Sequence, residues 1–219
     1  MCDLLVLAAF PPELAPLRAT LGDSLCRSFG GLEVVAKAVG IGLATSAAGA
    51  ASRIAALKPR AVVLVGTCGV YARATSLVVG GVAIGRRVVL GDLAVARGEA
   101  AYPEPMSTEA TCDRALAEGL VAHGGRQVDV ATTLAVTTND GSAAAIAEGI
   151  SCDAEHLEAY GVAAACAAEA VPFVAVLGVA NVVGARARDE WKRNHRAASD
   201  AAIAVLVKWM EAGAAGVPR

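Results

Sequence analysis

Short apolar runs of strand length alternate along the chain with longer segments of helical pattern. The apolar runs predict strands at Asp3–Ala9, Leu32–Val39, Ala61–Gly66, Val88–Ala96, Asp129–Thr138 and Phe173–Ala180. The helical segments are Leu43–Leu57, Thr108–Ala122, Glu158–Ala168 and Glu190–Ala212, with a further helix start at Pro11-Pro12. This alternation predicts one α/β domain over residues 1–219, a three-layer sandwich in which helices flank a central mixed β-sheet.

Composition and charge remove several classes of function. The chain has 219 residues, 56% of them apolar, and a net charge of −2 without a basic stripe, so we expect no nucleic-acid partner. Its longest uncharged stretches, Ala38–Ser52 and Ala170–Ala185, are shorter than the roughly 18 to 20 apolar residues of a spanning helix, so we expect no membrane partner. The start Met1-Cys2-Asp3 lacks the basic region of a signal peptide.

The cysteines and histidines show no metal-ligand spacing. Six cysteines are scattered without a CxxC pair, and there are three histidines. We therefore expect no metal site, and we expect reduced thiols in a cytoplasmic protein.

Polar residues interrupt the apolar pattern where strands are expected to end, which is where α/β sheets bind ligands. Glu13 follows the first strand, Gly66-Thr67-Cys68-Gly69 follows a buried strand, and Asn181 follows the last one. His156 and Glu158 precede a helix, and in an extended segment they point to one side. Each position also has a purely structural interpretation: a first-turn acid, a tight turn, a helix cap or a strand-end turn.

In order and spacing, these positions resemble the purine nucleoside phosphorylase and nucleosidase superfamily across nearly the whole chain. Ala8–Glu13 resembles the start of methylthioadenosine/S-adenosylhomocysteine nucleosidases. Gly40-Ile41-Gly42 is similar to the GIG segment of the family, and Gly66–Gly69 to its G-S/T-x-G loop. Leu157-Glu158 before Val171–Val174 is similar to the M-E pair before a VPFV strand.

The resemblance implies a role for each matching residue. Glu13 would polarise the attacking water, Glu158 would hold the ribose hydroxyls, and Asn181 occupies the place of the acid that protonates purine N7. The residues expected around the sugar and base are Ile41, Thr67, Cys68, Gly69, Thr138, Asn139, His156 and Leu157. His156 stands where adenine-cleaving relatives have a glutamate. No organic cofactor or metal is implied.

Two departures from the family pattern narrow the expectation. Leu64 stands where phosphorylases have a phosphate-binding arginine, which favours water as the nucleophile because a buried phosphate needs a cation. Asn181 replaces an aspartate, and its amide suits a 6-oxopurine because it donates a hydrogen bond but cannot release a proton. The stretch Asn181–Trp191 resembles a futalosine hydrolase pattern, in which Arg186 or Arg188 would meet the benzoate carboxylate of the substrate.

The sequence therefore predicts a nucleosidase that cleaves the N-glycosidic bond of a purine nucleoside, of the futalosine type that releases hypoxanthine in menaquinone biosynthesis. A methylthioadenosine/S-adenosylhomocysteine nucleosidase and a purine nucleoside phosphorylase remain alternatives. A catalytically weak ligand-binding protein of this fold is a third alternative. The expected partners are a small-molecule purine nucleoside and a second copy of the chain, since the small-residue helix from Leu43 could pack closely in a homodimer.

Overall fold

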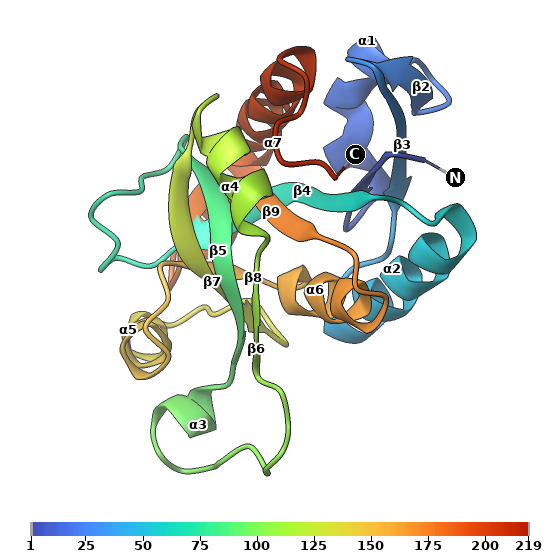
Figure 1. Ribbon diagram of the computed structural model, residues 1–219. Helices are drawn as coiled ribbons and strands as arrows, with labels where there is room; N and C mark the ends of the chain where they lie inside the picture. Colours follow the sequence, from blue (N-terminus) through green and yellow to red (C-terminus); the bar gives the residue numbers. More distant parts are fainter. Residues whose placement is uncertain (1, 219) are drawn as a thin grey trace.

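The computed structural model describes residues 2–218, which contain a nine-stranded mixed sheet with helices packed around it (Figure 1). The strands are β1 (Leu4–Ala8), β2 (Cys26–Phe29), β3 (Leu32–Ala38), β4 (Ala61–Val70), β5 (Val82–Gly91), β6 (Glu109–Thr111), β7 (Arg126–Thr133), β8 (Ala154–His156) and β9 (Phe173–Val182). The helices are a 3₁₀-helix η1 (Pro11–Leu17), α1 (Arg18–Leu21), α2 (Leu43–Leu57), α3 (Leu93–Ala96), α4 (Arg114–Val121), α5 (Asp140–Gly149), α6 (Ala159–Ala168) and α7 (Ala187–Glu211). The predicted α/β fold with a mixed sheet flanked by helices is confirmed.

The uncharged runs form the centre of the sheet because both of their faces are covered. β1 is buried at every position and pairs in parallel with β3 on one side and β4 on the other. β4 in turn pairs in parallel with β9, and α7 packs against both of these strands. The carboxyl ends of β1, β4 and β9 therefore reach the same edge of the sheet.

Part of the sheet closes on itself. The strand order is β2-β3-β1-β4-β8-β7-β5-β6, and β9 pairs with both β4 and β5. The strands β4, β8, β7, β5 and β9 thus form a hydrogen-bonded ring, which the sequence pattern did not predict. A bulge between Cys68 and Gly69 shifts the register of β4 against β9 where the ring meets the sheet edge.

Two predicted elements were right over only part of their length, because side-chain caps start helices inside them. The expected strand Val88–Ala96 is β5 followed by α3, since the Asp92 carboxylate accepts the Val95 N–H and caps a helix there. The expected helix Thr108–Ala122 begins as β6, and α4 starts only after Asp113, which caps it through the Leu116 N–H.

The expected strand Asp129–Thr138 was also wrong at its end, because β7 stops at Thr133. Residues 134–138 are a loop in which the Leu134 side chain is 78% exposed, so the apolar residues of this segment do not reflect sheet burial. β2, β8 and α5 were not predicted from the pattern.

The small-residue helix α2 packs within the chain, against α6. A Cβ on Gly161 of α6 would lie 2.6 Å from the Leu43 carbonyl oxygen, so glycine is required for this close approach. None of the helices within residues 2–218 is long and apolar enough to cross a membrane.

Candidate active site

A cavity of about 500 Å³ opens at the carboxyl ends of β1, β4 and β9. It brings together Glu13, Thr67, Glu158 and Asn181, which are far apart in sequence. The other predicted residues that line it are Ile41, Cys68, Gly69, Thr138, His156, Leu157 and Arg188. The strand-end positions selected from the sequence therefore meet in one place.

The carboxylate of Glu13 is buried and held by backbone donors. Its Oε2 accepts N–H groups from Ala9 at 3.1 Å and Phe10 at 3.4 Å, and its Oε1 accepts the Thr67 N–H at 3.3 Å. Burial raises the pKa of Glu13 to about 7, assisted by the negative charge of Glu158 and opposed by the backbone hydrogen bonds. Glu13 satisfies N–H groups at the start of its own helix and also lines the cavity, so its structural role does not exclude a functional one.

The carboxylate of Glu158 is also buried, at 4% exposure. Its Oε1 accepts the Gly42 N–H at 2.8 Å, at the start of α2, and its Oε2 lies 3.3 Å from His156 Nδ1. Glu158 stands at the N-cap of α6, but its side chain makes no capping hydrogen bond. Its carboxylate is instead directed toward the cavity side of the helix start.

His156 is a neutral side chain in this site. Its Nδ1 accepts N–H groups from Glu158 and Ala159, each at 3.1 Å, so the proton is assigned to Nε2. Burial lowers the pKa of His156, although the charge of Glu158 opposes this. The Nε2 lies 3.4 Å from the place that a Cβ on Gly66 would take, and Glu13 Oε1 lies 3.1 Å from the same place. Glycine at position 66 therefore keeps open the space that the imidazole N–H and the Glu13 carboxylate share.

Asn181 closes another part of the cavity. Its Nδ2 donates to the Val182 carbonyl at 3.0 Å and would lie 2.8 Å from a Cβ on Gly69, so a larger residue there would displace the amide. On the neighbouring helix α7, Trp191 Nε1 donates to Thr67 Oγ1 at 3.0 Å. This hydrogen bond connects α7 to β4 at Thr67, the same residue whose backbone N–H donates to the Glu13 carboxylate.

Cys68 contributes to the wall and not to the chemistry. Burial raises the pKa of its thiol to about 12, so the thiol stays protonated and is a weak nucleophile. Among residues 2–218, no group of three or more His, Cys, Asp or Glu side chains is arranged to hold a metal ion.

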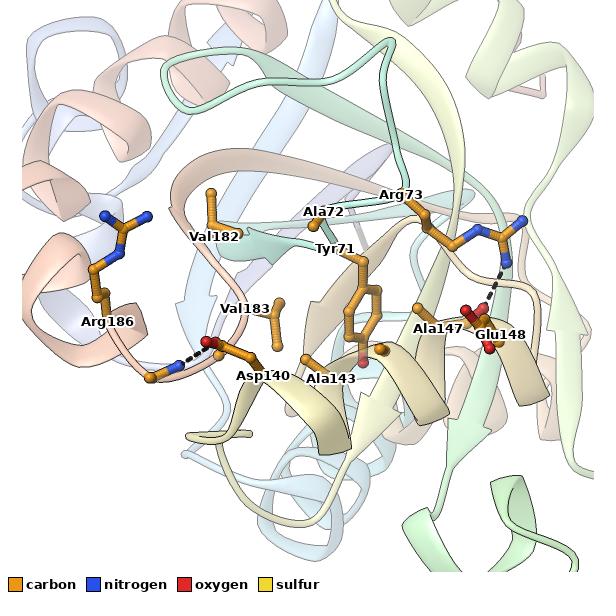
Figure 2. A pocket seen from close by; sticks show the side chains of 13 residues that line it. Tyr71, Ala72, Arg73, Asp140, Ala143, Ala147, Glu148, Val182, Val183 and Arg186 are labelled. Carbon is orange, nitrogen blue, oxygen red and sulfur yellow. Dashed lines mark hydrogen bonds between the residues drawn. The ribbon is translucent and has the colours of Figure 1, made fainter.

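Two predicted residues lie outside this cavity. Asn139 caps α5, where its Oδ1 accepts the Ser142 N–H at 3.0 Å. Arg186 lies 3.5 Å from Glu190 and lines a separate cavity of about 620 Å³, shown in Figure 2. The charged side chains of that second cavity are exposed, whereas the first holds buried carboxylates, so we place the chemistry in the first.

Sequence reasoning missed several lining residues. They are Ala9, Phe10, Val136, Glu155 and Ala187. Glu155 could have been found from its place next to His156, but β8 (Ala154–His156), which positions both residues, was not predicted. Trp191 was noted only as part of a pattern.

No protein-family model matches the sequence, and a search of curated proteins finds no match. Solved structures do match. The 5′-methylthioadenosine/S-adenosylhomocysteine nucleosidase from Neisseria meningitidis, in complex with methylthio-immucillin-A, has a TM-score of 0.85 and 19% identity, covering 97% of this chain and 100% of that chain. The S-adenosylhomocysteine nucleosidase from Streptococcus pyogenes has a TM-score of 0.85 and 20% identity, covering 96% of this chain and 97% of that chain.

A futalosine hydrolase from Helicobacter pylori also matches, with a TM-score of 0.83 and 15% identity, covering 95% of this chain and 96% of that chain. At these identities the likeness shows the fold. The chain thus has the fold of these nucleosidases over nearly its whole length, as its resemblance to the nucleoside phosphorylase and nucleosidase superfamily predicted.

Proposed function

We propose that the protein hydrolyses the N-glycosidic bond of a purine nucleoside. The observation that carries this proposal is the pair of buried carboxylates, Glu13 and Glu158, in one cavity at the carboxyl ends of the parallel strands. A carboxylate that can bind water and a second that can accept two hydroxyl groups are what cleavage of a nucleoside requires. The fold shared with known nucleosidases supports the same activity.

The proposed reaction uses water and the side chains of this cavity. The bond from C1′ to N9 breaks and its electron pair leaves with the purine, while the sugar becomes cation-like. The purine departs as an anion that takes up a proton from solvent, and Glu13 afterwards releases to solvent the proton that it gains from water. The water oxygen forms a bond to C1′ and gives a proton to the Glu13 carboxylate, whose negative charge stabilises the developing positive charge. Glu158 holds the ribose hydroxyls in line for attack, while its Oε1 is itself oriented by the Gly42 N–H.

Water suits this cavity better than phosphate as the nucleophile. Leu64 is completely buried in β4 and lies outside the cavity lining. Among the described lining residues, Arg188 is the one Lys or Arg side chain, beside three carboxylates. A phosphate dianion would therefore meet more negative than positive charge.

Within this activity, we propose a futalosine-type substrate that releases hypoxanthine, as in menaquinone biosynthesis. Asn181 offers an amide to a 6-oxopurine, and Arg188 offers a cation to an anionic group at the far end of the substrate. A methylthioadenosine/S-adenosylhomocysteine nucleosidase is the alternative, since such enzymes share the fold.

Base release from a panel of nucleosides tests the proposal. Inosine, a carboxylate-bearing futalosine-type nucleoside, methylthioadenosine and adenosylhomocysteine would be incubated with the protein, with and without phosphate. We expect hypoxanthine release without phosphate, fastest from the carboxylate-bearing substrate. Phosphate dependence would identify a phosphorylase, and faster adenine release would identify the alternative nucleosidase. Nucleoside binding without base release would identify a binding protein.

We also propose that the protein acts in the cytoplasm as a homodimer. Its six cysteines are free thiols, which suits a reducing compartment. Ile41 and Val136 line the cavity and are 61% and 50% exposed, so an apolar rim surrounds part of its mouth. Sedimentation equilibrium at micromolar concentration should give twice the chain mass of 21.9 kDa, and a monomer would contradict the proposal.

A further inference from the structure

The segment formed by residues 134–138 is a thin wall between two cavities. Val136 and Thr138 line the candidate active site, and both also line a separate cavity of about 270 Å³. The segment connects β7 to α5, and its Leu134 and Val136 side chains are largely exposed. Packing therefore holds the 134–138 segment only weakly, because there is open space on both of its sides.

One carboxylate tethers this segment. The Thr137 N–H donates to Glu155 Oε1 at 3.0 Å, and the Thr137 hydroxyl donates to Glu155 Oε2 at 2.5 Å. In the part of the chain that the structure describes, these are the hydrogen bonds that residues 134–138 make. The place of the wall thus depends on Glu155.

Glu155 is itself held firmly. It is 6% exposed and lies on β8, paired with Gly69 of β4. The Tyr71 hydroxyl donates to its Oε2 at 3.0 Å from the other side. Burial raises the pKa of Glu155, and the hydrogen bonds from Thr137 and Tyr71 oppose this by favouring the charged form. A buried carboxyl group is costly unless its oxygens accept hydrogen bonds, so the bonds from Thr137 and Tyr71 stabilise Glu155 in the cavity wall.

Glu155 and Asn181 lie at the same position along the strands. Gly69 of β4 is in register with Glu155 on β8 and with Asn181 on β9. A shift of the 134–138 segment into the 270 Å³ cavity would therefore widen the site beside Asn181.

We propose that Glu155 is a positioning residue that holds the 134–138 segment against the active-site cavity and so sets how closely the cavity fits its nucleoside. The inference rests on the proposed nucleosidase function. Glu155 does not act as an acid in this scheme, because both of its oxygens already accept hydrogen bonds. Its effect is on substrate binding, through the place of the wall.

Four variants distinguish a positioning role of Glu155 from a role of its charge. Glu155→Ala removes the tether. Glu155→Gln retains it, because the amide oxygen can accept the Thr137 N–H while the amide nitrogen donates to the two hydroxyls, which can both turn to accept. Thr137→Val removes the hydroxyl bond from the segment side, and Tyr71→Phe is the matched control that removes a hydroxyl bond while leaving both bonds to Thr137.

We expect Glu155→Ala to raise KM about tenfold with kcat within a few-fold of the parent, in line with the loss of one or two hydrogen bonds. Thr137→Val should raise KM less, and Glu155→Gln and Tyr71→Phe should stay near the parent. In parallel, amide hydrogen exchange of Thr137 is measured without substrate. The exchange should be fast in Glu155→Ala and slow in Glu155→Gln, Tyr71→Phe and the parent.

Unchanged KM and unchanged Thr137 exchange in Glu155→Ala would overturn the proposal. So would a Glu155→Gln variant whose kcat falls as far as that of Glu155→Ala, because that result assigns an acid or base role. If Glu155→Ala does not fold, Thr137→Val takes its place. Unchanged KM and unchanged amide exchange at residue 137 would then overturn the proposal. If the parent protein releases no base from any nucleoside, the proposed function is overturned. The hydrogen-exchange data would still test whether Glu155 tethers the 134–138 segment.

Discussion

Replacing Glu13 with Gln is expected to lower kcat by about 10²- to 10⁴-fold while the affinity for substrate changes little. The amide keeps the size of the side chain but loses the negative charge that faces the cation-like sugar. It also loses the basicity that takes the proton from water. Both interactions strengthen in the transition state more than in the bound ground state, so the loss falls on kcat.

The pH dependence gives an independent check on the same carboxylate. The pKa of Glu13 is raised from 4.5 to about 7, and the ionised form is the active one, so turnover of the parent should rise with pH through about 7. The contribution of Glu13 to folding stability changes with pH in the opposite direction to turnover. The protonated side chain is favoured in the folded state, so its stabilising contribution is full below pH 4.5 and is lost as pH rises through about 7. Glu13→Gln should show neither trend.

Glu158→Gln is the matched control for this carboxylate pair. Glu158 is expected to hold the ribose hydroxyls in both the ground state and the transition state, so its replacement should raise KM as well as lower kcat. Steady-state kinetics of the two variants, with a binding measurement by calorimetry, would distinguish the roles. Turnover of Glu13→Gln within a few-fold of the parent would remove Glu13 from catalysis.

Replacing Asn181 with Asp is expected to shift base preference from 6-oxopurines to adenine by about 10- to 100-fold. Asn181 Nδ2 donates to the Val182 carbonyl, so this position favours a hydrogen-bond donor. An introduced carboxyl group is therefore expected to keep its proton beside that carbonyl and to act as an acid toward a departing adenine. The mismatch at a hydrogen-bonded base is worth on the order of 1–3 kcal/mol, which sets the size of the change.

The measurement is the ratio of kcat/KM for inosine-type and adenosine-type substrates in parent and variant. Asn194→Asp is the control, because Asn194 Nδ2 also donates to a strand carbonyl, that of Ala180 at 2.9 Å, but Asn194 does not line the cavity. An unchanged ratio in Asn181→Asp would show that this amide does not read the base. The futalosine-type proposal would then depend on Arg188 and the panel of substrates.

Local pattern was sufficient for the buried strands, and together with the family resemblance it identified much of the cavity lining. An uncharged run such as Ala61–Gly66 is stable in water only when both faces are covered, so its place at the centre of a sheet follows from composition. The helix Leu43–Leu57 was predicted with the observed bounds, because small residues and the following Pro59 delimit it. Glu13 and Asn181 were identified because polar groups near the ends of such strands reach the ligand-binding edge. The expectation that Asn181 follows its strand was wrong, because β9 extends to Val182.

Helix starts and loops were harder to predict, because a single side-chain hydrogen bond can determine where a helix begins. Asp92 and Asp113 each start a helix within a segment whose apolar pattern indicated another structure. Arg186 and Arg188 were equivalent candidates in the sequence. Two positions apart at a helix start, however, they point in widely different directions, and only Arg188 reaches the active-site cavity.

The sequence by itself therefore determined the α/β class and the buried strands, because burial of apolar runs is a local property of composition, and its resemblance to a known family identified Glu13 and Glu158. Only the tertiary structure decided the closed ring of strands, the neutral state of His156 and the tether from Glu155 to Thr137. Each of these depends on hydrogen-bond partners that lie 2 to 18 residues away in sequence or on separate strands, and the apolar pattern contains no information about which partners meet.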